Sequence, residues 1–413
     1  MATEKAIRLS GLLLLIVFSL LVGYAWGATR TSPLINELQA ENQHDLTDEE
    51  VGDSREIDFA NGNTTGTHLP ITLSSLKQNS LKDSLHQHIQ TWLAQDQLAR
   101  SNGYTYAIDI AQLMVYFANE GDLENYTTFR NLAVEHLILN DPSDPYTQGF
   151  VAWRYQPQQE LDASGTTEAL WIARGLWLGS QKFNNPSDKE LALLILDGYG
   201  RHAYVDQDIW LIRNYFNLGA RCFSPNSYLV DYYPDFLQEV ASTVGDSVTF
   251  GDLTPTSLFQ KSLDLIHQAE ARSGLLYSII LPEIKTLTPD LNIVVFSPND
   301  IIQFSNTCLV AETVIKSDAQ LTQKILNFAN KHFDTLKIYY DGSTGEAVTE
   351  QAASISEWSC LVRLATHLND TTMTQKTIKQ AEPLWQIFDK NPYEPRLYTA
   401  GQILLSIQAM TTR

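Results

Sequence analysis

The strongest constraint on the fold of this chain is a helical hydrophobic pattern that begins near residue 75. Apolar residues recur there at spacings of three and four, which is typical of α-helices with a buried face. The pattern divides into twelve segments, at 81–99, 103–119, 122–139, 162–182, 187–199, 228–242, 255–272, 299–317, 319–333, 349–368, 373–389 and 395–410. It predicts an all-α domain over residues 75–413.

The even-numbered segments differ from the odd ones in how they begin. Each follows a short polar sequence, here called a lead-in: RSNGYTY from 100, LDASGTTE from 161, FSPNSYL from 223, FSPNDII from 296, DGSTGEAVTEQ from 341 and KNPYEPRLY from 390. Ser, Asn, Asp and Gly are residues that cap helix starts. Several even segments are apolar on more than one face, whereas the odd segments keep a charged face. The even helices are therefore expected to form an inner layer and the odd ones an outer layer.

The lead-ins recur about every fifty to seventy residues, one helical hairpin apart. An open solenoid of helix pairs would need a more regular repeat and more similar units. The pattern therefore favours a closed ring of six hairpins, an (α/α)6 barrel. The string FSPN occurs in two successive lead-ins, at 223–226 and 296–299, and predicts an apolar approach, a Pro stop and a capped inner helix.

An uncharged apolar run at 9–26 follows Lys5 and Arg8. Its length and positive flank predict a signal peptide or membrane anchor over 1–28, with the rest of the chain exported across the membrane. Ala25 and Gly27 could serve a signal peptidase, so a cleaved signal and an uncleaved anchor both stay open. Residues 29–74 are polar and acidic, and they predict a flexible stalk.

The charge balance and cysteine spacing exclude several functions. The chain has 28 basic and 48 acidic residues, a formal charge of -20 that repels nucleic acid. Cys222, Cys308 and Cys360 are too far apart in sequence for a metal site; they are either buried thiols or one disulfide with a remaining thiol. P-loop, GxSxG, HExxH and dinucleotide-binding motifs do not occur, so no cofactor or metal is expected.

Inner helices that run parallel would gather their lead-ins at one end of the barrel. Aromatic and acidic residues concentrate in and beside these lead-ins, a combination that suits a sugar polymer, because rings stack on pyranose faces and paired carboxylates cleave glycosidic bonds. The catalytic candidates are Glu168, Asp300 and Asp162, and the substrate-binding candidates are Asn102, Tyr106, Trp153, Arg154 and Tyr228. The simpler alternative is that these acidic residues only cap helices or lie in their first turns.

The order of these motifs resembles glycoside hydrolase family 8. The likeness covers roughly residues 95–320, from RSNGYTYAIDIAQLMVYFA through GFVAWRYQP and DASGTTEALW to FSPNSYLVDYYPDFL and FSPNDIIQFSNTCLVAE. The resemblance implies a six-hairpin barrel that acts on β-1,4-glucans, xylans or chitosan with inversion at the anomeric carbon.

The chain departs from that family at its catalytic acid. The family opens its first inner helix with Ser-Glu-Gly, and Asn102 stands at the position of the Glu. An amide cannot donate the catalytic proton. Asp162 matches the first Asp of the family's sugar-binding cluster, whose second Asp is absent, and Glu168 is the nearest carboxyl on that helix. Asp300 matches the family's catalytic base, and Tyr228 ends a segment similar to its Asn-Pro-Ser-Tyr.

Two functions remain. The chain is either an exported polysaccharide hydrolase with Glu168 or Asp162 as acid and Asp300 as base, or a catalytically inactive barrel that binds a polysaccharide at the cell surface.

Overall fold

The chain divides into two units, residues 1–68 and 69–413. The computed structural model describes residues 75–411 of the second unit, apart from 207–208, 285–291 and 298. The expected export segment at 1–28 and stalk at 29–74 lie outside the described residues and stay predictions. Within the described part, none of the helices combines the length and hydropathy needed to cross a bilayer.

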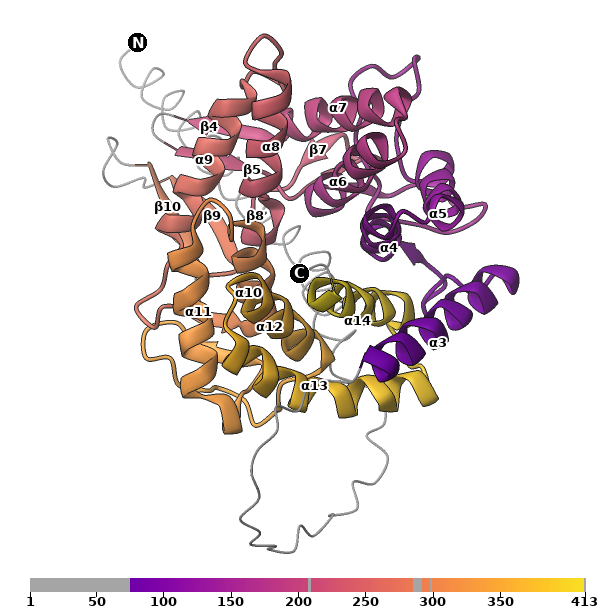
Figure 1. Cartoon of the computed structure of the whole chain (residues 1–413). Coiled ribbons are helices and arrows are strands. Elements are labelled where there is room, and N and C mark those ends of the chain that lie inside the picture. The colour runs from indigo at the N-terminus through magenta and orange to yellow at the C-terminus, as the bar shows by residue number, and fades with distance from the viewer. Residues whose placement is uncertain (1–74, 207–208, 285–291, 298, 412–413) are drawn as a thin grey trace, which may run out of the picture. The chain divides into compact units, whose positions relative to one another are not determined.

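Twelve α-helices occur in the described part, as the hydrophobic pattern predicts. The inner helices are α4 (Ala107–Glu120), α6 (Thr166–Lys182), α8 (Pro234–Val244), α10 (Phe304–Thr313), α12 (Ile355–His367) and α14 (Arg396–Thr411). The outer helices are α3 (Ser75–Ala94), α5 (Leu123–His136), α7 (Pro186–Gly200), α9 (Pro255–Gln268), α11 (Ala319–Lys331) and α13 (Thr371–Lys390). A 3-10 turn, η1 (Leu229–Asp231), precedes α8. The outer helices lie around the inner ones (Figure 1).

The inner elements form a closed ring. Going round it, α4 contacts α6, α6 contacts η1, η1 contacts α10, and α12 and α14 lead back to α4. Gln402 on α14 donates a hydrogen bond from Nε2 to Oε1 of Gln112 on α4, at 2.8 Å, where the last inner helix meets the first. This contact is the one that an open solenoid would lack.

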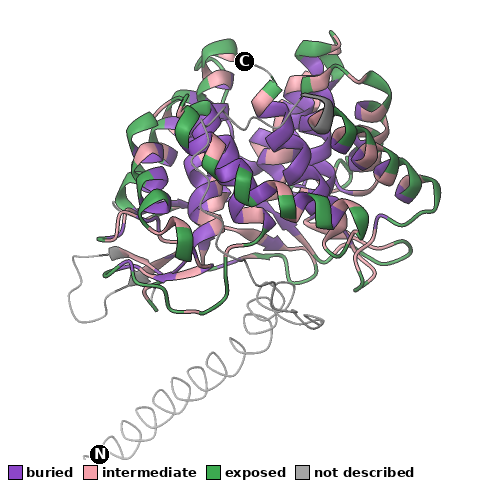
Figure 2. Ribbon diagram, turned by 60° about the horizontal axis from the view of Figure 1, so that its bottom comes forward, coloured by how far each residue is buried: buried purple, intermediate pink, exposed green. Residues whose placement is uncertain are grey.

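Burial follows the alternation read from the sequence. Inner helix α4 buries nearly every residue from Ala107 to Ala118, whereas outer helix α5 buries only Tyr126, Phe129 and Ala133. Figure 2 shows the buried residues gathered on the interior faces of the helices and the exposed ones on the outside. Removing the apolar side chains of both layers from water provides the main driving force for this packing.

The expectation of a purely helical domain is incomplete, because short strands occupy the connections. They are β1 (Thr105–Tyr106), β2 (Arg154–Tyr155), β3 (Ala163–Gly165), β4 (Ala203–Asp206), β5 (Ile209–Ile212), β6 (Tyr215–Asn217), β7 (Cys222–Phe223), β8 (Ser227–Tyr228), β9 (Ile279–Ile284), β10 (Asn292–Phe296), β11 (Ile301–Gln303) and β12 (Tyr339–Asp341). The sheets are β1-β2, β3-β6-β7, β4-β5, β8-β9-β10 and β11-β12, all antiparallel.

These strands delay the start of the inner helices. The first inner helix begins at Ala107 instead of 103, and the fourth begins at Phe304 instead of 299. Turn residues with positive φ, Gly103 at 85° and Asp300 at 54°, reverse the chain before these two helices. Polar residues that were expected to cap these helices therefore lie in or beside the paired strands.

The two FSPN strings share one arrangement. Each begins where a strand ends, and each first serine is buried, Ser224 after β7 and Ser297 after β10. Both hydroxyls accept backbone N–H bonds, from Tyr215 in the first copy and from Ser278 in the second. The predicted apolar approach is confirmed. The predicted helix cap is wrong, because β8 and β11 intervene before the helices begin.

Candidate active site

Neighbouring lead-ins are held together around one end of the ring. Arg396, at the start of α14, donates a hydrogen bond from Nη2 to the carbonyl oxygen of Ala99 at 3.3 Å. Strands β1, β8 and β11 belong to the first, third and fourth lead-ins. Each pairs with a strand that precedes or enters the next lead-in, namely β2, β9 and β12. The lead-ins therefore bring their polar side chains to the end of the barrel where the inner helices begin.

Asn102 and Tyr106 are in direct contact in the first lead-in. The Nδ2 group of Asn102 donates a hydrogen bond to the Tyr106 hydroxyl at 2.8 Å. The guanidinium of Arg100 lies over the Tyr106 ring at 3.9 Å and forms an ion pair with the buried Asp109 at 2.9 Å. Arg100 and Asp109 were not selected from the sequence, because an acidic residue in the first turn of an apolar helix is explained by the helix dipole alone.

Trp153, Arg154 and Asp162 form one bonded group. The exposed carboxylate of Asp162 accepts hydrogen bonds from Trp153 Nε1 at 2.8 Å and from Arg154 Nη2 at 3.1 Å. It also accepts one from the backbone N–H of Ala163 at 2.8 Å. Trp153 in turn packs edge-on against Tyr106, with ring centroids 5.6 Å apart. This group joins the first lead-in to the second, and Asp162 acts in it as an acceptor.

Glu168 lies in the first turn of α6 and its carboxyl folds back over Gly165. A methyl group added at Gly165 would overlap Oε2 of Glu168 and would lie 3.2 Å from Cβ of Trp153. Burial is the main cause that raises the pKa of Glu168 to about 7. The charge of Asp231 raises this pKa as well, while the backbone N–H of Glu168 and the charge of Arg100 lower it.

Asp231 is a fully buried carboxyl whose charge acts on the half-buried Glu168. It accepts hydrogen bonds from the Thr167 hydroxyl at 2.6 Å, from Asn214 Nδ2 at 3.0 Å and from the backbone N–H of Tyr228 at 2.7 Å. Burial raises the pKa of Asp231 to about 6, although these hydrogen bonds oppose the rise. The sequence placed Asp231 beside Tyr228 without giving it a role, because its contacts with residues 167 and 214 cross from other hairpins.

Asp300 has different surroundings. Its Oδ1 atom accepts a hydrogen bond from the Tyr277 hydroxyl at 2.7 Å, and its backbone carbonyl accepts one from Gly342 N–H at 2.7 Å. A methyl group added at Gly342 would lie 2.5 Å from Oδ1 of Asp300. The helix-capping alternative is wrong for Asp300 and for Asp162, because α10 begins at Phe304 and α6 has Gly165 as its N-cap.

The structure therefore brings most of the predicted site together. Hydrogen bonds and ring contacts connect Asn102, Tyr106, Trp153, Arg154 and Asp162. The charge of Asp231 acts on Glu168, and Asp231 accepts a hydrogen bond from the backbone N–H of Tyr228. Asp300 lies one step further round the ring, beyond the pairing of Tyr228 with Ile279 in β8 and β9 and the bond from Ser297 N–H to the Ile279 carbonyl.

Metal-binding clusters and disulfides are both absent from the described part of the chain. It contains no cluster of three or more His, Cys, Asp or Glu side chains that could hold a metal ion. Cys222 is exposed and unpaired, while Cys308 and Cys360 are buried free thiols whose side chains interact with each other.

No family model and no curated protein sequence matches the chain. Solved structures do. An α-amylase from Clostridium perfringens superposes with a TM-score of 0.60 at 16% identity, over 74% of this chain and 86% of that one. The endo-β-1,4-glucanase CMCax from Acetobacter xylinum gives 0.55 at 14%, over 76% and 91%. A GH8 protein from Teredinibacter turnerae, solved as a xylobiose complex, gives 0.57 at 12%, over 82% and 93%.

The superpositions establish the fold alone; the first of these proteins is an α-amylase and the second an endo-β-1,4-glucanase. The chain is therefore a six-hairpin (α/α)6 barrel that shares its architecture with the glycoside hydrolases of family 8 and related six-hairpin glycosidases.

Proposed function

We propose that this protein is a glycoside hydrolase that cleaves a β-1,4-glucan-like polysaccharide, with Glu168 as general acid. The observation that carries the proposal is the Glu168 carboxyl, which is packed over Gly165 at an inner-helix start and has a pKa of about 7. A carboxyl that stays protonated near neutral pH can donate a proton to a leaving glycosidic oxygen. The fold shared with glycosidases supports the same conclusion.

Asp300 is proposed as the general base. An inverting hydrolase needs an ionised carboxylate that takes a proton from the attacking water on the opposite side of the sugar. The Tyr277 hydroxyl is hydrogen-bonded to Asp300 and fixes the direction of its carboxylate. Burial, together with the Asp300 charge, raises the pKa of Tyr277 to about 12, so this hydroxyl keeps its proton at working pH.

Asp162 fits substrate binding better than proton donation. Its oxygens already accept three hydrogen bonds, including one from Arg154. Sugar hydroxyls can add to such a polar group, and the half-buried Trp153 ring beside it suits contact with a pyranose, while the buried Tyr106 packs behind Trp153. Tyr228, in the third lead-in, is proposed as a further substrate contact. The proposal includes export of the barrel by residues 1–28.

The test measures hydrolysis of polysaccharides by residues 29–413 of the chain. The substrates are carboxymethylcellulose, mixed-linkage glucan, xylan, chitosan and starch, and reducing ends are counted. Starch is included because the structures with this fold include an α-amylase. Release of reducing ends from a β-1,4-linked polymer, with an inverted anomer seen by proton NMR, is the expected result. The absence of turnover on every polymer would refute the proposal.

One observation favours a second function, binding without hydrolysis. Asn102 stands where the family 8 pattern has its acid, and its amide is hydrogen-bonded to Tyr106. A barrel that had lost hydrolysis would still present Trp153 and Asp162 to a polysaccharide. Micromolar binding of cellohexaose without cleavage would support this alternative. Loss of measured activity in Glu168→Gln and Asp300→Asn would eliminate it.

A further inference from the structure

A pocket of about 480 Å³ lies at the end of the barrel away from the lead-ins. Its walls are the first residues of α5, which follow the end of α4, and the turn Phe183–Asn185, which follows the end of α6. Helices α4 and α6 have 14 and 17 residues, so about 20–25 Å separates this pocket from their starts. It is therefore distinct from the candidate active site.

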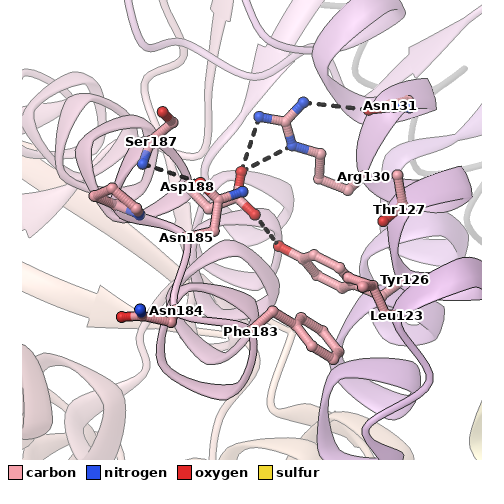
Figure 3. Close-up of a pocket in the computed structure, with 11 residues that line it drawn as sticks. Leu123, Tyr126, Thr127, Arg130, Asn131, Phe183, Asn184, Asn185, Ser187 and Asp188 are labelled. Atoms are coloured by element: carbon pink, nitrogen blue, oxygen red, sulfur yellow. Dashed lines mark hydrogen bonds and ion pairs between the residues drawn. The ribbon is translucent and has the colours of Figure 1, made fainter.

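The base of the pocket is fixed by a buried carboxylate. Asp188, with no exposed side-chain surface, accepts hydrogen bonds from the Tyr126 hydroxyl at 2.7 Å and from Arg130 Nε at 2.8 Å (Figure 3). Arg130 also donates from Nη1 to Oδ1 of Asn131 at 3.2 Å. The Tyr126 hydroxyl occupies the space that a side chain at Gly179 would fill. These contacts form the base without any ligand.

The pocket carries no net charge. Arg130 and Asp188 are the charged residues among those that line it, and they neutralise each other. A phosphate or carboxylate would have to compete with Asp188 for the guanidinium. The volume of the pocket is in the range of small-molecule sites, about 300–1,000 Å³.

The rim combines neutral hydrogen-bonding groups with apolar surface. Exposed amides and hydroxyls come from Thr127, Asn131, Asn184 and Ser187. Apolar surface comes from Leu123, which is 55% exposed, and from Phe183 and Pro186. Neutral polar groups beside apolar faces match the chemistry of a sugar ring, which has hydroxyls at its edge and C–H groups on its faces.

We infer that this pocket is a second carbohydrate site, which binds a neutral oligosaccharide away from the catalytic end. The choice of a sugar as ligand rests on the proposed function, whereas the location and neutrality of the pocket do not. A site here would hold one part of a polymer while another part occupies the lead-ins. Linking two such sites raises the effective concentration of the polymer at the catalytic end.

The experiment is calorimetric titration of the full chain carrying Glu168→Gln, which blocks turnover, with cellohexaose and with maltohexaose. We expect two binding sites for at least one of them. Adding Thr127→Arg places a long charged side chain on the rim and should remove one site, with at least a tenfold loss of affinity. Thr128→Arg, on the same helix outside the pocket, is the matched control and should keep both sites.

Trp153→Ala on the same background separates the two ends. It should weaken the lead-in site and leave the pocket site, so the pocket can be measured even where the proposed hydrolysis fails. Equal binding by the Thr127→Arg and Thr128→Arg proteins would overturn the inference. So would binding of hexagalacturonate, a charged oligosaccharide, that Thr127→Arg strengthens while neutral hexamers do not bind.

Discussion

Glu168 and Asp300 are carboxyls near the starts of two inner helices, and their surroundings are opposite in kind. Glu168 is packed against Gly165, and burial raises its pKa to about 7. Asp300 lies in a turn with φ 54° and is held by the hydroxyl of Tyr277. Packing positions the Glu168 carboxyl, whereas a hydrogen bond positions the Asp300 carboxyl. In the proposed mechanism, this difference would let one barrel use the same type of side chain as acid at one helix start and as base at another.

The largest expected effect comes from removing either carboxyl. Glu168→Gln and Asp300→Asn should each lower kcat by about 10²–10⁴-fold, the range for loss of general acid or base catalysis. The measurement is the initial rate of reducing-end release. Asn102→Ala is the control and should change kcat by less than about tenfold, because an amide transfers no proton. A larger loss in Asn102→Ala than in Glu168→Gln would place the acid elsewhere.

The packing of Glu168 can be tested without touching its carboxyl. Gly165→Ala should displace the side chain and lower kcat by about 10²-fold, since small misplacements of a reacting group have effects of this size. Gly219→Ala is the matched control, because the nearest atom to a methyl group added there is Asn217 Oδ1 at 3.7 Å. Its activity should be unchanged. Equal activity of the two proteins would separate Glu168 from catalysis.

The pH profile should report the charge of Asp231. In the native protein, kcat/KM should fall as pH rises through about 7, because Glu168 then loses its proton. Asp231→Asn removes a neighbouring negative charge that raises the pKa of Glu168. The alkaline limb should therefore move down by about one pH unit. Rates measured from pH 5 to 9 test this shift, and an unmoved limb would show that Asp231 does not act on the acid.

The smallest expected effect is on stability. The pKa of Glu168 is raised from its ordinary 4.5, so the folded state binds more protons than the unfolded state between about pH 4.5 and 7. Stability is therefore lost as pH rises through that window, and Glu168→Gln should recover it. The free energy of unfolding should rise by about 1–3 kcal/mol at pH 8 and hardly change at pH 4. Urea denaturation at both pH values measures the difference.

The sequence predicted the barrel well because its helices are long and its layers differ in composition. Twelve helices and their alternation follow from period and burial, which are local properties. The short strands were missed, since pairs such as Tyr106 with Arg154 in β1 and β2 join residues far apart in sequence. No local pattern distinguishes a two-residue strand from a helix cap.

The candidate site shows the same limit. The concentration of aromatic and acidic residues in and beside the lead-ins led to the choice of Trp153, Asp162 and Glu168, which lie near one another in the structure. The pattern could not provide the protonation state or the hydrogen-bond partners of each carboxyl. The contacts of Asp231 with Thr167 and Asn214 cross from neighbouring hairpins, and they decide how that carboxyl is bound.

The hydrogen bond between Gln402 and Gln112 joins residues 290 positions apart. During synthesis, the first inner helix leaves the ribosome long before the helix that completes its packing. Until α14 arrives, the apolar flank of α4 that packs against it stays exposed to water or to a chaperone. Ring closure therefore comes late, because it needs contacts between residues far apart in sequence. Structures that depend on such contacts fold slowly. Deleting α14 should therefore expose α4 and destabilise the whole ring.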